Sequence, residues 1–279
     1  MSKLKFYFLI IIIIPLFTGC YKNSYLSIHV IDVGQGDSIL IQTPTNANIL
    51  VDGGNEDSSS IVRSYLKKHK IKSLDMIIAT HLDSDHIGSL DNIIDDFDVK
   101  SIYTPEQTSS SDSFKNLLTS CLNKDIEIQY FEKGDVKKLD NNIELTVLSP
   151  SYIQDENNSN SIVFKLDYNN KSFLFTGDAT TSNELDIIDS FNLDNVDFLK
   201  VGHHGSSTST SDDFLKATTP DIAVISCGYK NQYGHPHKKV LDNLSSNNII
   251  TYRTDLTGDM IFYSDGNTIF TKKDYSHKK

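Results

Sequence analysis

The sequence predicts an α/β fold in which two mixed sheets pack against each other and helices cover both outer faces. Short apolar runs typical of strands alternate along the chain with amphipathic stretches typical of helices. The strands fall into two similar groups, each interleaved with helices, which indicates two packed sheets. A chain of 279 residues with 38% hydrophobic residues is long and apolar enough for one such domain. We expect this domain to cover residues 26–270.

The first twenty residues have the pattern of a bacterial lipoprotein signal peptide. Lys3 and Lys5 form a basic start, an unbroken apolar run follows from Phe6 to Ile14, and small residues precede Cys20. The apolar run is short for a membrane span, which needs about 20 residues. We therefore predict cleavage before Cys20 and lipidation of this cysteine, with an uncleaved N-terminal anchor as the alternative. Either outcome places the rest of the chain outside the cytoplasm, attached to the cell membrane.

The first group of strands and helices follows this leader. Runs of apolar residues predict strands, and apolar residues at helical spacing predict helices. A turn at Val33-Gly34-Gln35-Gly36 joins the first two strands. In chain order we expect strands from Leu26 to Asp32, Asp37 to Gln42 and Asn48 to Val51, a helix from Ser59 to His69, a buried strand from Leu74 to Ala79 and a helix from Ser89 to Phe97.

The second group follows a polar middle region. Residues 108–113 and 149–160 are rich in Ser and Asn and are typical of exposed loops. The expected helices run from Phe114 to Asn123, Ser182 to Ser190, Asp212 to Ala217 and Lys239 to Leu244. The expected strands run from Ile143 to Leu148, Ser161 to Tyr168, Ser172 to Thr176, Phe198 to Val201, Ile222 to Cys227, Ile249 to Arg253 and Asp259 to Tyr263.

Acidic and histidine side chains recur where these strands end. His81-x-Asp83-x-Asp85-His86 places four potential metal ligands in six residues, directly after a buried strand. Imidazole and carboxylate groups suit divalent ions such as Zn²⁺ or Mn²⁺, and crowded carboxylates need a cation for neutralisation. Taken alone, the segment could also be a solvated acidic turn.

Three further strand ends favour the metal site. Asp178 follows an apolar strand and is a candidate bridge between two metals, or else a turn residue. His203 and His204 follow another strand, so one of them is a candidate metal ligand and the other a proton or hydrogen-bond donor. His235 is a ligand, a substrate contact or a loop residue.

The net charge and the cysteines limit the function classes. There are 26 Lys and Arg residues against 37 Asp and Glu, a formal net charge of -11, which disfavours tight non-specific DNA binding. Cys121 and Cys227 have no C-x-x-C spacing, so a structural zinc site is not expected. The sequence leaves open whether these two cysteines form a disulfide.

Taken together, the motifs resemble those of the metallo-β-lactamase superfamily, and within it the hydrolase domain of the ComEC family of DNA-uptake proteins. The resemblance extends from about residue 28 to residue 262, in family order. The matching stretches include HVIDVGQGDSILI, ILVDGG, THLDSDHIGSL, NSIVFKL, FLFTGD, LKVGHHGSSTS, YGHPH and TYRTDLTGDM. The resemblance implies a four-layer αβ/βα sandwich and a site for two divalent metal ions.

The resemblance also implies roles for individual residues. Asp52 matches an orienting residue, and Asn160 and Ser161 occupy the region of a further motif on the orienting or substrate side. Asp85, His203 and His204 are the implied catalytic residues. The implied metal ligands are His81, Asp83, Asp85, His86, Asp178, His204 and His235.

Two departures from the wider superfamily bear on the metal. Asp83 stands where the superfamily has a second histidine, and no histidine occupies the region of Asn160. One metal site is therefore richer in oxygen, which makes Mn²⁺ a candidate beside Zn²⁺ and leaves single occupancy open.

The resulting hypothesis is a hydrolase that cleaves a phosphodiester outside the cytoplasm by means of a metal-activated hydroxide. Its expected partners are a phosphodiester or another small anionic substrate, DNA among them, and the membrane through the lipid anchor. One alternative is hydrolysis of a small ester, lactam or lactone on the same core. Another is a metal-stabilised envelope subunit without catalytic activity. We expect no channel function, because no hydrophobic span follows the leader.

Overall fold

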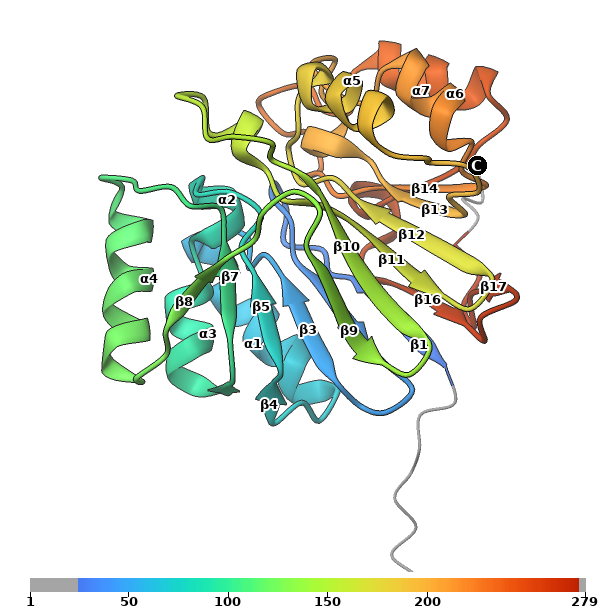
Figure 1. The fold of residues 1–279 in the computed structure, drawn as a ribbon. Coiled ribbons are helices and arrows are strands. Elements are labelled where there is room, and N and C mark those ends of the chain that lie inside the picture. The colour runs from blue at the N-terminus through green and yellow to red at the C-terminus, as the bar shows by residue number, and fades with distance from the viewer. Residues whose placement is uncertain (1–24, 276–279) are drawn as a thin grey trace, which may run out of the picture.

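The computed structural model describes residues 25–275, which form four layers (Figure 1). Two large sheets pack face to face, and helices cover the outer face of each. The predicted α/β sandwich is therefore confirmed. The proposed signal peptide and Cys20 lie outside the described residues. Within residues 25–275, no helix is long and apolar enough to cross a membrane.

The first sheet has eight strands in the order β17-β16-β1-β2-β3-β5-β7-β8. Strands β3, β5, β7 and β8 are parallel, and the others pair antiparallel. Its strands are β1 (Leu26–Val30), β2 (Ile39–Gln42), β3 (Asn48–Val51), β5 (Met76–Ile78), β7 (Ile102–Thr104), β8 (Ile128–Tyr130), β16 (Met260–Ser264) and β17 (Ile269–Phe270). A separate small pair consists of β4 (Ser73–Leu74) and β6 (Asp98–Val99).

The second sheet has seven strands in the order β15-β14-β13-β12-β11-β10-β9. Strands β12 to β15 are parallel, and β9 to β12 are antiparallel. Its strands are β9 (Val136–Asp140), β10 (Ile143–Ser149), β11 (Val163–Tyr168), β12 (Lys171–Phe175), β13 (Phe198–Lys200), β14 (Ile222–Ile225) and β15 (Ile250–Arg253).

The helices divide between the two outer faces. Apolar side chains of α1 (Ser59–Lys68), α3 (Leu90–Asp96) and α4 (Asp112–Asn123) pack on the first sheet. Those of α5 (Thr181–Ser190), α6 (Asp212–Thr218) and α7 (Lys238–Ser246) pack on the second sheet. The shorter helices are α2 (Ser84–Ile87), α8 (Thr254–Thr257) and the 3₁₀ turns η1 (Glu56–Ser58), η2 (Asn158–Asn160) and η3 (Gly202–Gly205).

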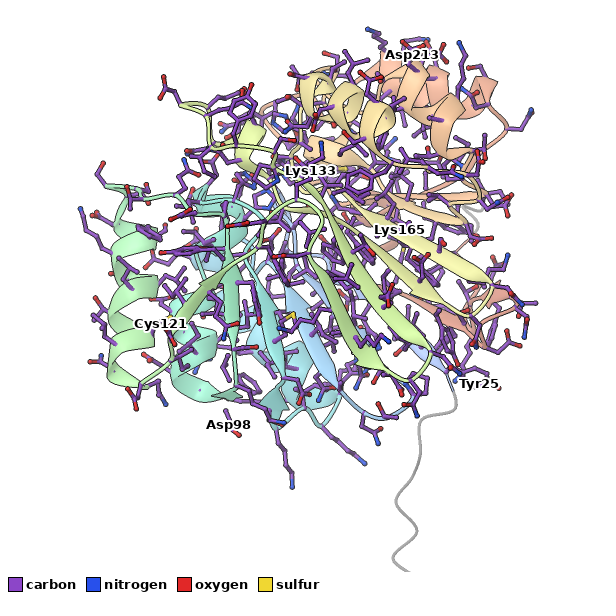
Figure 2. All side chains as sticks on the ribbon, in the orientation of Figure 1. Tyr25, Asp98, Cys121, Lys133, Lys165 and Asp213 are labelled. Atoms are coloured by element: carbon purple, nitrogen blue, oxygen red, sulfur yellow. The ribbon has the colours of Figure 1, made fainter. Side chains whose placement is uncertain are left out.

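The central strands of both sheets are buried on both faces, which explains their continuous apolar runs. In β2, Ile39 and Ile41 face the core between the sheets, whereas Leu40 faces the helices. Side chains fill the space between the layers (Figure 2). The cysteines lie in different parts of this packing. Cys121 is on α4 and Cys227 follows β14, and both are buried free thiols, so they do not form a disulfide in this structure.

Several predicted boundaries were wrong for identifiable reasons. Asp37 is not in a strand, because its backbone N–H donates to the carbonyl oxygen of Asp85 (3.2 Å) and holds the chain in a turn before β2. Ser161 also precedes its strand. The Ile162 N–H donates to the carbonyl oxygen of Thr80, which follows β5 of the first sheet (2.8 Å), so the ladder of β11 begins only at Val163. The short strands β7, β8, β9 and β17 were not predicted.

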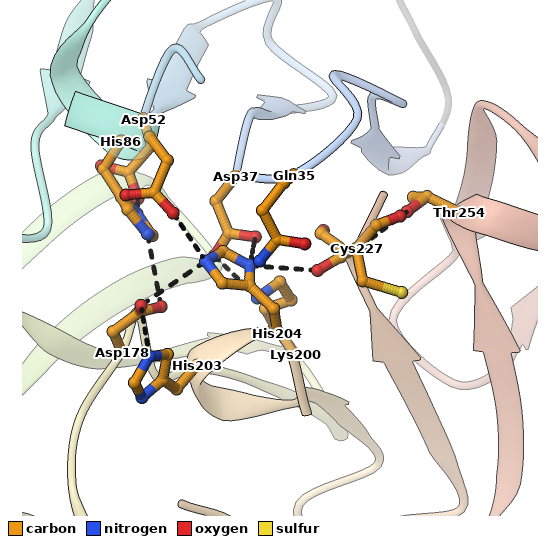
Figure 3. A network of polar contacts seen from close by, with 12 residues as sticks. Gln35, Asp37, Asp52, His86, Asp178, Lys200, His203, His204, Cys227 and Thr254 are labelled. Atoms are coloured by element: carbon orange, nitrogen blue, oxygen red, sulfur yellow. Dashed lines mark hydrogen bonds and ion pairs between the residues drawn. The ribbon is translucent and has the colours of Figure 1, made fainter. Parts of the chain in front are cut away.

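The parallel parts of the two sheets place loops from both halves at one edge. Asp52 follows β3, and the His81–His86 segment follows β5. Asp178 follows β12, and His203 and His204 follow β13. Figure 3 shows that residues from both halves meet there.

Candidate metal centre

The His81–His86 segment combines a loop with the single turn of α2. Its backbone is fixed by bonds from the N–H groups of His86 and Ile87 to the Asp83 carbonyl oxygen (3.0 Å each). A bond from the Gly53 N–H to the His86 carbonyl oxygen (2.7 Å) joins the segment to the end of β3. His81 and His86 are fully buried, whereas Asp83 and Asp85 are partly exposed.

Asp52 orients His86. Its Oδ2 lies 2.8 Å from His86 Nδ1 and accepts from the Thr80 hydroxyl (2.8 Å), and its Oδ1 accepts from the Thr80 N–H (2.8 Å). A carboxylate at Nδ1 keeps the proton there and leaves Nε2 with a free lone pair. The Nε2 atom points toward Asp178 Oδ1, 3.3 Å away. This geometry suits the predicted orienting role of Asp52.

Asp178 lies at the centre of the cluster. It is buried, its N–H donates to the Ser161 hydroxyl (3.1 Å), and its Oδ2 lies 3.5 Å from His204 Nε2 and 3.6 Å from His203 Nε2. Ser161 thus positions the backbone of Asp178. A carboxylate between imidazoles from two different loops has the location expected of a metal bridge.

His203 and His204 sit in a tight turn of left-handed backbone, with φ of 47° and 54°. The planes of the two rings are 76° apart. His204 is buried, and its Nδ1 lies 3.0 Å from the Ser226 carbonyl oxygen while its Nε2 lies 3.3 Å from Asp85 Oδ2. The ring of His203 is partly exposed, with Nδ1 3.0 Å from the Thr208 hydroxyl. Both Nε2 atoms face Asp178 Oδ2, but of the two rings only that of His204 is buried, which favours His204 as the ligand.

The structure adds a residue that the sequence analysis missed. Asp37, His86, Asp178 and His204 each offer one ligand atom, and these four atoms lie within 4.8 Å of one another. Asp37 comes from the Gly-Gln-Gly-Asp turn before β2, which reads as an ordinary turn. Its Oδ2 lies 2.7 Å from the buried ammonium of Lys200. A lysine in the apolar strand β13 was the only sequence signal that a buried carboxylate was needed.

Buried atoms without a hydrogen-bond partner mark the same place. Such atoms are rare, because an unsatisfied buried polar group costs about 1–3 kcal/mol. Those in this cluster are Asp37 Oδ1, His81 Nε2, His86 Nε2, Asp178 Oδ1 and His204 Nε2. The residues therefore fit bound cations, which would satisfy these lone pairs.

The protonation behaviour of the cluster points the same way. Burial alone would lower the pKa of His204, but Asp178 and Asp37 outweigh it and raise that pKa to about 10. Burial is likewise outweighed at His86, where Asp178 and Asp52 raise the pKa well above its usual value. Burial would raise the pKa of Asp178, yet His204 and His86 lower it well below its usual value. The carboxylates thus attract positive charge into a buried site, as metal ions would supply.

The half of the site near His81 offers fewer donors. His81 Nε2 lies 3.6 Å from Asp83 Oδ2, and the other Asp83 oxygen accepts from Asn157 (2.6 Å). Asn160 is buried but turned away, because its amide oxygen accepts from the Gln154 N–H (2.7 Å) and its amide nitrogen donates to the Gln154 carbonyl oxygen (2.8 Å). Asn160 therefore braces a loop and has no free amide oxygen directed at the cluster.

His235 lies beside the cluster, outside the group of four. Its ring is 5.5 Å from that of His203 and 6.3 Å from that of His204, between centroids, and it stacks on Tyr233 at 5.7 Å. Its Nδ1 is buried without a partner. Burial, together with the positive charge of His204, lowers the pKa of His235 to about 4. The structure places His235 next to His203, and its role as a ligand stays a prediction.

A groove of about 670 Å³ opens beside Asp85. Amide and hydroxyl side chains line it, together with three carboxylates. The lining residues, all of them in the described part of the chain, include no Lys or Arg. They are Val33, Gln35, Asn55, Glu56, Asp57, Ser58, Ser84, Asp85, Ser113, Asn231, Gln232 and Tyr233.

Comparison with known proteins agrees with this geometry. The sequence model of the metallo-beta-lactamase superfamily matches residues 31–229. ComE operon protein 3 of Bacillus subtilis is 32% identical over 249 residues, covering 83% of this chain and 32% of that protein. Recombination protein 2 of Haemophilus influenzae is 30% identical over 236 residues, covering 82% of this chain and 28% of that protein. The chain thus spans about a third of the length of these curated relatives.

Solved structures agree on the fold. The metallo-beta-lactamase fold protein YhfI from Bacillus subtilis superposes with a TM-score of 0.59 at 12% identity, covering 86% of this chain and all of that one.

Proposed function

The chain belongs to the metallo-β-lactamase superfamily and is a metal-dependent hydrolase of that fold, and we propose that its substrates are phosphodiesters. The observation that carries the proposal is the oxygen-rich donor set around Asp178. Asp37 belongs to the same buried group, Asp85 Oδ2 lies 3.3 Å from His204 Nε2, and Asp83 Oδ2 lies 3.6 Å from His81 Nε2. A lactamase-type zinc site is richer in imidazole. Such donors favour harder divalent ions, which pair well with phosphoryl oxygens. The named relatives, a competence-operon protein and a recombination protein, are consistent with nucleic acid as one substrate.

The residues divide into a holding set and a substrate-facing set. We assign His81, Asp83, Asp85, His86, Asp178 and His204 to holding the metal ions. When bound, divalent ions would activate the attacking water and draw charge from the phosphoryl oxygen. Asp52 and Ser161 act through their neighbours, since Asp52 fixes the ring of His86 and Ser161 fixes the backbone of Asp178.

His203 is the candidate proton donor. Its Nε2 lies at the border between Asp178 and solvent, where it can donate a hydrogen bond to a phosphoryl oxygen or a proton to the leaving oxygen. The ring of His235 lies next to that of His203, with 5.5 Å between the ring centroids.

The test is metal-dependent hydrolysis of bis-p-nitrophenyl phosphate and of single-stranded DNA. We expect activity with Mn²⁺ or Zn²⁺, its loss in Asp178→Ala, and wild-type rates in Asp242→Ala, which removes an exposed carboxylate on α7. His203→Gln should lower kcat by about 100-fold or more at unchanged metal content, as for loss of a general acid. Absence of phosphodiester turnover with either metal would refute the proposal.

The groove favours a second candidate function. Its carboxylates Glu56, Asp57 and Asp85, and the net charge of -11, repel a long polyanion. A small ester, lactone or lactam, or a phosphate ester with a cationic alcohol, would avoid that repulsion. A substrate panel with one phosphocholine ester and one β-lactam separates the candidates by kcat/KM.

We also propose that this chemistry takes place outside the cytoplasm, with the protein held to the membrane by lipid on Cys20. The lipoprotein signal pattern supports this. Labelling cells with a palmitate analogue should mark the wild-type protein and not Cys20→Ala, and the variant should lose its mature-size, membrane-bound form. Equal labelling of both proteins would contradict the proposal.

A further inference from the structure

Asp37 is a buried acid of the metal centre whose two oxygens face different partners. Its Oδ2 accepts from the Lys200 ammonium (2.7 Å), and that ammonium also donates to the Val201 carbonyl oxygen (3.0 Å). Its Oδ1 has no hydrogen-bond partner and lies 3.5 Å from His204 Nδ1. Asp37 and Lys200 are both almost fully buried. One oxygen is therefore fixed by a cation, and the other is left free in the cluster (Figure 3).

The ion pair sets the position of the Asp37 carboxylate. Lys200 ends β13 in the second sheet, and Asp37 lies in the turn before β2 of the first sheet. A buried carboxylate without such a partner would be driven toward the neutral form or out of the site. Lys200 thus keeps the carboxylate charged and close to His86, Asp178 and His204.

The metal centre has two parts that differ in the donor atoms they offer an ion. The part with Asp37 has two imidazoles and two carboxylates, all buried, whose ligand atoms lie within 4.8 Å of one another. The part with His81 also has the partly exposed Asp83. The Asn160 amide is hydrogen-bonded at both ends to the Gln154 backbone.

We propose that Asp37, held by Lys200, is a protein donor to one tightly bound divalent transition-metal ion shared with His86, Asp178 and His204. The ion at His81 and Asp83 is then the weaker of two. The centre would work with one resident ion and a second, exchangeable one. This inference rests on the metal-binding character of the family and not on the identity of the substrate.

The test measures metal content and affinity on the full chain, purified in detergent. After chelation and re-titration with Mn²⁺ or Co²⁺, we expect one ion per wild-type chain to survive gel filtration, and a second to bind only at higher concentration. Asp83→Asn and His81→Ala should abolish the second ion and leave the first in place. Two ions of equal affinity would overturn the proposal.

Asp37→Asn keeps a hydrogen-bond acceptor for Lys200 and removes the charged donor. Its affinity for the tight ion should fall at least about 100-fold, and Lys200→Met should lower it by about 10- to 100-fold, as for an outer partner of a ligand. Lys200→Arg should recover part of that loss. The absorption of bound Co²⁺ should change in Asp37→Asn and stay unchanged in Asp83→Asn at one equivalent.

A double variant separates a folding defect from a binding defect. Asp37→Leu combined with Lys200→Met replaces the ion pair by apolar groups. We expect this double variant to unfold in one cooperative transition, even if a single variant does not. The same protein should still fail to retain the tight ion. Wild-type affinity in this double variant, or in Asp37→Asn, would show that Asp37 is only structural and would overturn the proposal.

Discussion

Asp52→Asn should weaken metal binding through a change in one imidazole tautomer. Asp52 is fully buried and has φ of 57°, a left-handed conformation that asparagine adopts readily, so the backbone should be preserved. The asparagine oxygen can still accept from the Thr80 N–H. The new amide N–H then replaces Oδ2 and donates toward His86 Nδ1, where the wild-type carboxylate accepts (2.8 Å). This moves the imidazole proton to Nε2, the atom that faces Asp178.

The expected size follows from what is lost. Replacing the orienting carboxylate of a metal-bound histidine typically lowers affinity about 10- to 100-fold, which is about 1.4–2.7 kcal/mol. A titration against a chromophoric chelator at pH 7.5 measures this directly. Asp242→Asn, an exposed change on α7, is the control. Affinity within twofold of wild type for Asp52→Asn would refute the orienting role, provided that circular dichroism shows an intact fold.

Three further changes test other parts of the structure. His29 is buried, and burial together with the nearby His69 lowers its pKa to about 3. The stabilisation by neutral His29 is therefore complete above pH 6.5. It falls by about 1.4 kcal/mol per pH unit as the pH drops from 6.5 to 3. Urea unfolding of His29→Gln should therefore depend less on pH than wild type in that window, and equal slopes would contradict this. Gly36→Ala places a Cβ against the carbonyl oxygen of Asp85 at φ of 133°, so the melting temperature and metal retention should both fall. An unchanged melting temperature would argue against this close contact. Glu56→Lys should increase kcat/KM for single-stranded DNA at low salt and not for bis-p-nitrophenyl phosphate, and equal changes for both substrates would show that the groove does not select by charge.

The sequence was sufficient for the layers of the fold and for most of the cluster. Continuous apolar runs identify strands buried on both faces, and chemically active residues at their ends converge because parallel strands share an edge. This reasoning places Asp52, His86, Asp178 and His204 together. It could not find β8 or β9, whose residues are exposed or half-buried and lack an apolar run.

Asp37 shows why part of the site was missed. In a Gly-Gln-Gly-Asp turn, an aspartate is expected to face solvent, and its partner Lys200 is 163 residues away. Only the lysine was anomalous, since a charged side chain in Phe-Leu-Lys-Val should not be buried alone. The sequence also did not indicate how the Asn160 side chain is used. Both ends of its amide bond to the backbone of Gln154.

The ligands of the metal centre come from loops of both sheets, so ion binding is coupled to the packing of the two sheets. His86 belongs to the first half, and Asp178 and His204 follow strands of the second. An ion that binds only the folded chain, and whose free concentration is 100 times its Kd, stabilises the fold by about 2.7 kcal/mol. Without an ion, the carboxylates would repel one another across the same boundary. The Asp37–Lys200 pair places one fixed positive charge at that boundary and joins the turn before β2 to β13. The site is thus held together before an ion arrives, and binding requires little rearrangement of the ligands.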